Sequence, residues 1–185
     1  MTYLNLGDHK FGARLEQLVK RPEALNGIAI PTVRNLVESS IINGDFDAVI
    51  TSGPGEHEVN WGHSNHRVWK FDDSDDQYGP KLFQVEEMLF WGAQQEDVLV
   101  HCHAGMSRST ATAWGICIAK GLDAKESLLA LLEAHPIDLE YNGEKRWFCP
   151  NNLLVEHMQE IFNDNTLMDI REEVLRGDKR ISHWL

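Results

Sequence analysis

The chain has 185 residues, 42% of them hydrophobic and 25% charged, a composition typical of one soluble globular domain. Its formal net charge of −12 argues against binding along a nucleic acid or lying on an anionic membrane, because both surfaces repel an acidic protein. No apolar stretch reaches the ~20 residues of a membrane span, and the first residues lack the features of a signal peptide. The three cysteines, an odd and sparse set, fit a reducing cytoplasm better than a disulfide framework.

The spacing of apolar residues and of structure-breaking residues predicts strands that alternate with helices. Strands are predicted over 46–51, 66–71 and 98–101, with a short apolar run over 27–30. Helices are predicted over 11–20, 32–42, 81–95, 109–120, 123–134, 151–162 and from 166 to just before Gly177. This order favours an α/β fold with a central, mostly parallel sheet of four or five strands and helices on both faces.

Several residues mark where these helices begin and end. Asp123 with Glu126 is typical of a capping box, and Asn151 and Thr166 are typical N-cap residues. Gly121 is placed to stop a helix in the left-handed conformation.

Two polar loops follow predicted strands directly. The loop 72–76 reads Asp-Asp-Ser-Asp-Asp, and Cys102 comes immediately after the strand 98–101. Because ligands of parallel sheets bind beyond the carboxyl ends of the strands, we expect both loops at one edge of the sheet.

The second of these loops carries the most specific pattern in the chain. The segment His101–Thr110 reads His-Cys-His-Ala-Gly-Met-Ser-Arg-Ser-Thr, so that five residues separate Cys102 from Arg108 between an apolar strand and a helix. Such a layout is typical of a loop that wraps a phosphate dianion. A bare Cys-x5-Arg is a weak signal, and the strand, Gly105, Ser109 and the following helix make it specific.

Each part of this loop has a chemical reason. Arg108 offers a planar fork that matches two phosphate oxygens, and the helix start adds its positive end. Gly105 tolerates positive φ and close approach of the backbone to a ligand. Main-chain amides that form an anion nest can come from the residues between cysteine and arginine, namely His103, Ala104, Gly105, Met106 and Ser107.

The same donors would stabilise a thiolate at Cys102, which an ordinary cysteine forms only to a few per cent at neutral pH. Ser109 can donate a hydrogen bond to that sulfur and ease its departure from phosphorus. His101 is expected to point away from the ligand and to brace the loop by hydrogen bonding. We therefore predict Cys102 as the nucleophile and Arg108 as the residue that binds phosphate and stabilises the transition state.

The stretch Val-Leu-Val-His-Cys-His-Ala-Gly-Met-Ser-Arg-Ser-Thr resembles the signature of the cysteine-dependent protein tyrosine phosphatases, especially compact prokaryotic-type members of the dual-specificity branch. The resemblance runs from about Phe46 to Ala134, with weaker support from Cys149-Pro150-Asn151 before a late helix. It implies a cysteinyl-phosphate intermediate, no metal and no organic cofactor. The length predicts a single phosphatase-like domain over 1–185, with a catalytic core over 46–165. The N-terminal segment 1–45 is also assigned to this domain, although its first forty residues resemble no known family.

The family places a general-acid aspartate about thirty residues before the cysteine. Asp73 lies 29 residues before Cys102, and the preceding Trp-Lys-Phe-Asp resembles the family's strand-then-aspartate segment. Asp73 is therefore the predicted acid, which protonates the leaving oxygen and then, as a carboxylate, activates water. The alternatives are its neighbours Asp72, Asp75 and Asp76.

The predicted substrate is a phosphorylated protein, and the short chain leaves open phosphotyrosine as well as phosphoserine or phosphothreonine. None of the variable loop residues is lysine, which argues against a highly charged head group. A small phosphorylated molecule or an inositol phosphate stays an alternative substrate, and a weakly active phosphopeptide-binding pseudophosphatase is an alternative function. Rhodanese-like phosphatases and arsenate reductases share Cys-x5-Arg but lack an equivalent of Asp73. The sequence leaves the oligomeric state open.

The remaining histidines and cysteines have simpler interpretations. His101 and His103 sit on one tight loop and cannot easily converge on a metal ion, and a zinc site from His57, His63 and His66 is an alternative to solvated histidines. Cys117 and Cys149 are expected to be inert thiols, with a protective disulfide to Cys102 as the redox alternative.

Overall fold

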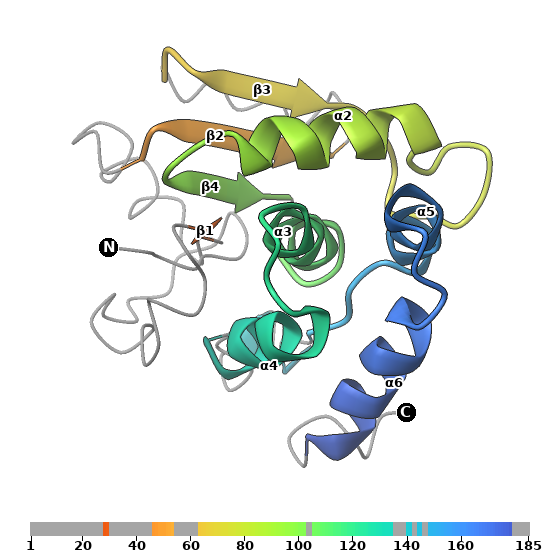
Figure 1. Ribbon diagram of the computed structural model, residues 1–185. Helices are drawn as coiled ribbons and strands as arrows, with labels where there is room; N and C mark the ends of the chain where they lie inside the picture. The colour runs from red at the N-terminus through yellow and green to blue at the C-terminus, as the bar shows by residue number, and fades with distance from the viewer. Residues whose placement is uncertain are drawn as a thin grey trace.

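The computed structural model describes residues 28–29, 46–53, 63–102, 105–134, 140–141, 144–145 and 148–178. In this part of the chain, strands alternate with helices and five helices lie beside a sheet (Figure 1). The α/β class predicted from the spacing of apolar residues is therefore confirmed. The helices predicted over 11–20 and 32–42 lie outside the described residues.

The central sheet is parallel throughout its described strands, in the order β1-β4-β2-β3. Its strands are β1 (Ile28–Ala29), β2 (Ala48–Ser52), β3 (His66–Trp69) and β4 (Val98–His101). The register pairs Ser52 with Trp69 and Thr51 with His101. The carboxyl ends of β2, β3 and β4 are therefore level with one another, which confirms that the loops after them share one edge.

The helices are α2 (Leu82–Ala93), α3 (Arg108–Ala119), α4 (Ala124–Ala134), α5 (Asn152–Phe162) and α6 (Leu167–Gly177). Two glycines let α2 and α3 approach each other closely. A Cβ at Gly115 would lie 2.7 Å from both methyl carbons of Leu89, and one at Gly92 would lie 2.5 Å from Cδ1 of Ile116. None of the described helices has the length and hydropathy needed to cross a membrane.

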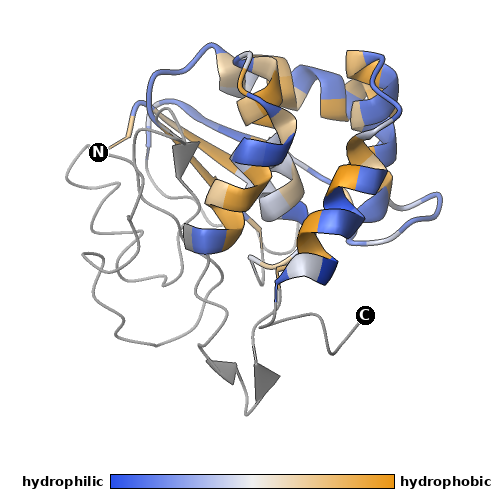
Figure 2. Cartoon of the chain, turned by 60° about the horizontal axis from the view of Figure 1, so that its bottom comes forward, coloured by the Kyte–Doolittle hydropathy of each residue, from blue (hydrophilic) through white to orange (hydrophobic). Residues whose placement is uncertain are grey.

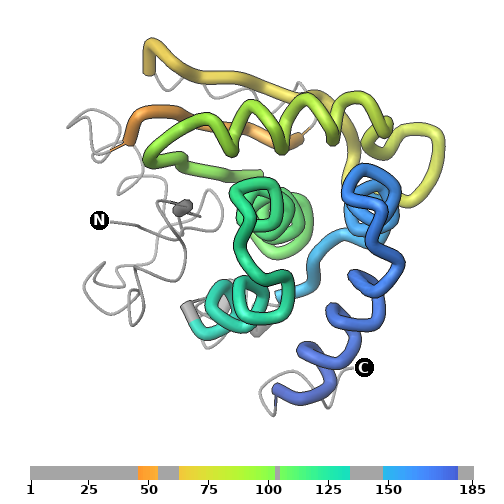
Figure 3. The backbone as a smooth tube through the Cα atoms, in the orientation of Figure 1, coloured from red at the N-terminus to blue at the C-terminus, as the bar shows by residue number. Residues whose placement is uncertain are grey.

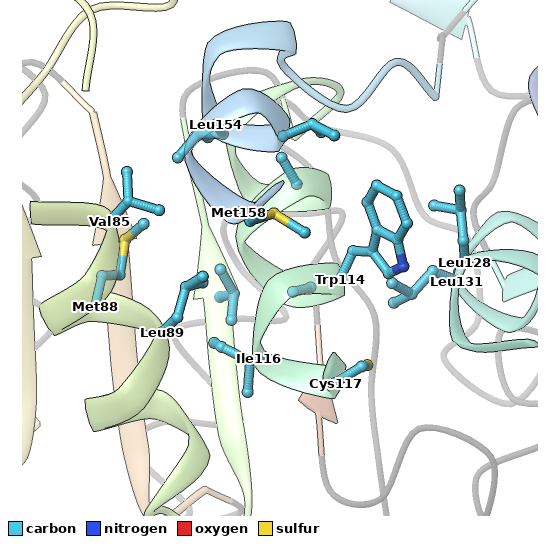
Figure 4. Close-up of a cluster of buried hydrophobic side chains, with 14 of the residues drawn as sticks. Val85, Met88, Leu89, Trp114, Ile116, Cys117, Leu128, Leu131, Leu154 and Met158 are labelled. Carbon is cyan, nitrogen blue, oxygen red and sulfur yellow. The ribbon is translucent and has the colours of Figure 1, made fainter. Parts of the chain in front are cut away.

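The hydrophobic core lies between the sheet and the helices, with Trp114 of α3 at its centre (Figure 4). Ile50 and Val100 of the sheet belong to this core and are fully buried. Val49 and Leu99, which alternate with them and face the opposite side of the sheet, are fully buried as well. Burial of both faces is what a parallel sheet requires. The outer helices have one hydrophobic and one hydrophilic side (Figure 2).

Most predicted helix ends are confirmed by their hydrogen bonds. The Asp123 carboxylate accepts from the backbone N–H of Glu126, and the Asn151 side chain caps α5 by accepting from the N–H of Leu154, both at 2.9 Å. Gly121 has a positive φ of 83° just after α3.

Thr166 is the N-cap residue of α6, as predicted, but its side chain makes no capping hydrogen bond. Its hydroxyl donates to Asp164 at 2.6 Å, and the Gln159 side chain accepts from the N–H of Met168 in the first turn of α6 instead. Gly177 is the last residue of α6 rather than the residue after it.

One small element was not predicted. The strands β5 (Glu140–Tyr141) and β6 (Glu144–Lys145) pair as an antiparallel hairpin. The Asn-Gly pair at 142–143 is a strong hairpin signal in the sequence and would have indicated it.

Candidate active site

The cysteine loop starts where β4 ends and leads into α3. Cys102 follows His101 directly, and α3 begins at Arg108 after the N-cap residue Ser107. Gly105 has φ 71°, a left-handed conformation that glycine tolerates, and its N–H donates to the sulfur of Cys102. His103 and Ala104, two of the predicted amide donors, lie outside the described residues.

The Cys102 side chain is 4% exposed and is surrounded by hydrogen-bond donors. Its sulfur accepts from the N–H of Gly105 at 3.1 Å and lies 3.2 Å from the hydroxyl oxygen of Ser109. The structure thus brings Ser109 to the sulfur, as the sequence predicted.

Arg108 is only 6% exposed, and one of its buried donors makes no hydrogen bond to the described residues. Its Nη1 donates to the carbonyl oxygen of Phe71 at 3.2 Å, while its Nε has no hydrogen-bond partner among the described residues. Leaving a buried donor unpaired costs about 1–3 kcal/mol, so this N–H marks a position where an acceptor is missing. An anionic oxygen beside the Cys102 loop would supply that acceptor.

Gly53, at the end of β2, lies against the same guanidinium. A Cβ at this position would be 3.2 Å from Nη1 of Arg108, closer than most side chains tolerate. The sequence shows Gly53 only as a breaker after a strand, and its contact with Arg108 becomes visible only in the folded chain.

Asp73 faces the loop from the end of β3. Its Oδ1 accepts from the Ser107 hydroxyl at 2.7 Å and from the Asn151 side-chain amide at 2.9 Å. Its Oδ2 lies 3.7 Å from Nε of Arg108. The carboxylate predicted as the general acid is therefore next to the predicted phosphate-binding arginine.

The other three aspartates of this loop are used differently. Asp76 accepts from the backbone N–H of Tyr78 and from the hydroxyl of Ser74, both at 2.9 Å, and these bonds lower the pKa of the Asp76 carboxyl. The carboxylates of Asp72 and Asp75 make no hydrogen bond or ion pair within the described residues. Asp76 shapes the loop, and Asp73 alone among the four reaches the cysteine loop in that part of the chain.

The segment 148–151 runs between α3 and α6 and braces the loop from the other side (Figure 3). The N–H of Cys149 donates to the carbonyl oxygen of Met106 at 2.9 Å, and the N–H of Asn151 donates to that of Ser107 at 3.3 Å. Sequence reasoning found Asn151 as a helix cap but missed its contact with Asp73.

A pocket of about 310 Å³ opens beside Asp73 and Ser107. Its wall is formed by four parts of the chain: the aspartate loop after β3, the cysteine loop, the segment that leads into α5, and α6. The lining residues are Asp73, Ser74, Asp75, Ser107, Cys149, Pro150, Asn151, Asn152 and Arg171. Arg171 was not singled out from the sequence, because a lone arginine on a late helix gives no signal there.

His101 braces the base of the loop, as predicted. Its Nε2 lies 2.6 Å from the hydroxyl oxygen of Thr51, which also lies 2.7 Å from Nε2 of His66. Burial, and the nearby His66, lower the pKa of His101 to about 3, so its ring is neutral at physiological pH. His63 bonds the carbonyl oxygen of Phe46 at 3.0 Å, and no group of metal-binding side chains is found in the described residues.

The other two thiols differ in their surroundings. Burial raises the pKa of Cys117 to about 12, so this thiol is uncharged inside the core. Cys149 is half-buried at the pocket wall, where its sulfur accepts from Nη2 of Arg171 at 3.3 Å. The expectation of an inert thiol therefore fits Cys117.

No protein-family model and no curated protein matches this sequence. Similar solved structures include Tk-PTP in its active form, at 19% identity over 69% of this chain and 86% of that chain, with a TM-score of 0.48. PTPMT1 in complex with PI(5)P is 17% identical over 74% and 88% of the two chains, and DUSP15 is 17% identical over 80% and 87%, each with a TM-score of 0.47. At these values the likeness carries no argument, and the function is inferred from this chain's own residues.

Proposed function

We propose that this protein hydrolyses phosphate monoesters through a cysteinyl-phosphate intermediate on Cys102. One observation carries the proposal: the buried Nε of Arg108 lacks an acceptor among the described residues, on the loop whose backbone and Ser109 surround the Cys102 sulfur. A tetrahedral phosphate held there would give Arg108 its acceptor and bring phosphorus to the sulfur. Asp73, 3.7 Å from the same Nε, stands where it can serve the leaving oxygen.

In the first step the Cys102 thiolate attacks phosphorus. An S–P bond forms as the P–O bond to the leaving group breaks, and Asp73 gives its proton to the departing oxygen. Arg108 and the loop amides hold the equatorial oxygens, where charge must be stabilised while one anion approaches another. The leaving group departs as a neutral alcohol or phenol.

In the second step water attacks the cysteinyl phosphate. The Asp73 carboxylate takes a proton from that water, an O–P bond forms and the S–P bond breaks. The sulfur leaves as a thiolate, for which the Gly105 N–H and the Ser109 hydroxyl are the available donors. Release of inorganic phosphate restores the starting state.

We further propose a phosphorylated protein side chain as the substrate, of the tyrosine or dual-specificity kind. The support is the resemblance of the Cys102–Arg108 loop and the absence of lysine from its variable positions.

The test is turnover of p-nitrophenyl phosphate by the wild-type chain and by Cys102→Ser. The wild type should release p-nitrophenol, and Cys102→Ser should lose turnover while it still binds inorganic phosphate in a calorimetric titration. Rapid acid quenching should trap one phosphate on the wild-type cysteine. The matched control is Cys117→Ala, a buried thiol away from the loop, which should keep its activity. Full turnover by Cys102→Ser would refute the proposal.

A further inference from the structure

Arg171 is a buried cation that has no counter-charge among the residues the structure describes. It is 8% exposed, and no carboxylate lies within ion-pair distance of it in the described structure. The other three arginines that the structure describes, Arg67, Arg108 and Arg176, each have a carboxylate oxygen within 3.7 Å. Burying a charge without a partner is expensive, so a site that keeps one calls for an explanation.

Hydrogen bonds account for only some of the N–H donors of Arg171. Its Nε donates to the carbonyl oxygen of Pro150 at 2.8 Å, and its Nη2 donates to the sulfur of Cys149 at 3.3 Å. Both partners orient the guanidinium plane, but neither a carbonyl nor a thiol cancels its charge. Nη1 makes no hydrogen bond to any residue that the structure describes, which leaves one end of the fork for a ligand.

Arg171 lines the pocket that adjoins the candidate active site. The two sites share Ser107 and Asp73, because both side chains belong to the pocket wall and also meet at Oδ1 of Asp73. The pocket, at about 310 Å³, is at the lower end of the volumes typical of small-ligand sites. A substrate whose phosphate lies over Cys102 therefore has room for a second group in front of Arg171.

We propose that Arg171 binds a second anionic group of the substrate, a phosphate or a carboxylate, and so sets specificity for phosphoesters that carry two negative groups. This rests on the proposed phosphatase function and names the substrate class of the same site. The exposed carboxylate of Asp75 on the same wall disfavours a cluster of charges, so one extra anion fits better than several. A doubly phosphorylated peptide and a small diphosphorylated molecule share this chemistry.

The experiment compares the kcat/KM of paired substrates. One pair is a phosphotyrosine peptide with and without a second phosphorylated residue nearby, and the other is an inositol with one or two phosphates. In at least one pair, the kcat/KM of the wild type should be about tenfold higher for the substrate with two anionic groups. A tenfold ratio corresponds to a free-energy difference of about 1.4 kcal/mol. The pair with the larger preference identifies the source of the second anion.

Arg171→Met should reduce that preference to about one, and Arg171→Lys should restore part of it. Arg176→Met is the matched control, because it removes the same charge from an exposed position of the same helix and should keep the preference. If Arg171 only held the segment before α5, its loss would slow both members of a pair equally. An unchanged ratio in Arg171→Met would therefore overturn the inference while leaving the phosphatase proposal standing.

Binding provides a readout that does not depend on turnover. On the Cys102→Ser background, pyrophosphate should bind about tenfold more tightly than inorganic phosphate, and the added Arg171→Met change should remove the difference. A wild-type chain with no turnover of p-nitrophenyl phosphate would overturn the proposed function, and this titration would still decide the role of Arg171. Thermal unfolding of each variant verifies that it is folded, and Arg171→Lys is the variant to use if Arg171→Met is not.

Discussion

Asn151 and Asp73 are 78 residues apart in the chain, yet the Asn151 side-chain amide donates to Oδ1 of Asp73 at 2.9 Å. The other atom of the same side chain, Oδ1, accepts from the N–H of Leu154 and caps α5. One residue thus ties the start of a helix to the candidate acid. Its two functions use different atoms, so substitutions can separate them.

The first prediction uses this separation. Asn151→Ala should lower the free energy of unfolding by about 1 kcal/mol through loss of the cap, and it should also lower kcat because Asp73 loses a donor. Asn151→Ser keeps a capping oxygen, so it should recover most of the stability but not the kcat. Urea titrations and steady-state kinetics measure the two effects. A serine variant with wild-type kcat would show that Asn151 has no part in positioning Asp73.

The second prediction concerns the acid itself. Asp73→Asn should lower kcat by about 10²- to 10⁴-fold for phosphate esters of poorly acidic alcohols, and by much less for esters whose leaving group needs no proton. The contrast between leaving groups is the diagnostic measurement. Asp72→Asn is the control, because its carboxylate makes no contact with the cysteine loop within the described residues. An equal loss in both variants would point to the charge of the loop rather than to one acid.

The third prediction concerns the guanidinium fork. Arg108→Lys keeps the charge but cannot present two N–H groups to two oxygens, and it should lower kcat/KM for p-nitrophenyl phosphate by about 10²- to 10³-fold. Arg67→Lys, which changes an exposed arginine paired with Glu87, should leave kcat/KM unchanged. Near-wild-type rates in Arg108→Lys would mean that phosphate is held elsewhere.

The fourth prediction follows from the buried imidazole under the loop. The pKa of His101 falls from 6.5 to about 3 on folding, so between these values the unfolded chain binds one more proton than the folded one. Stability must then decline as the pH falls through this window, by about 1.4 kcal/mol per pH unit, and this contribution is constant above it. Denaturant titrations from pH 7 to pH 4 should show a shallower decline for His101→Gln than for the wild type. Identical slopes would mean that His101 does not titrate on unfolding.

The fifth prediction concerns the thiol of Cys117. Because burial raises its pKa to about 12, iodoacetamide at pH 8 should leave it unmodified in the folded protein. Cys102 should react quickly, and added phosphate should protect it. Mass spectrometry of tryptic peptides distinguishes the sites, and denatured protein should be modified at all three cysteines. Rapid modification of Cys117 in the folded chain would contradict its placement in the core.

The elements that were predicted well are those fixed by local chemistry. The strand 98–101 is an unbroken apolar run with a polar end, and the glycine at 121 and the asparagine at 151 have their expected conformation and cap. The fold class follows from the alternation of such elements. The loop around Cys102 is also local, because its cysteine, glycine and arginine lie within seven consecutive residues. Together with the strand before it and the helix after it, this spacing predicts a phosphate site.

What could not be predicted depends on contacts between distant segments. Gly53 and Phe71 meet Arg108 only because parallel strands bring their carboxyl ends to one edge. Arg171 reaches the site through the packing of α6, for which the sequence offers no signal. At Thr166 the difference comes from a neighbouring residue instead. Its hydroxyl bonds to Asp164, two residues earlier, and a rule based on N-cap residue type does not consider this bond.

The alignment of three strand ends at one edge has a consequence for the recovery of this protein from denaturant. The proposed nucleophile Cys102 follows β4, the proposed acid Asp73 follows β3, and Gly53, which lies against Arg108, follows β2, so the proposed centre needs all three strands in place. A one-residue slip of any strand would turn its side chains to the wrong layer. Catalysis should consequently be among the last properties regained on refolding, after the signals of helix formation and compaction have reached their final values.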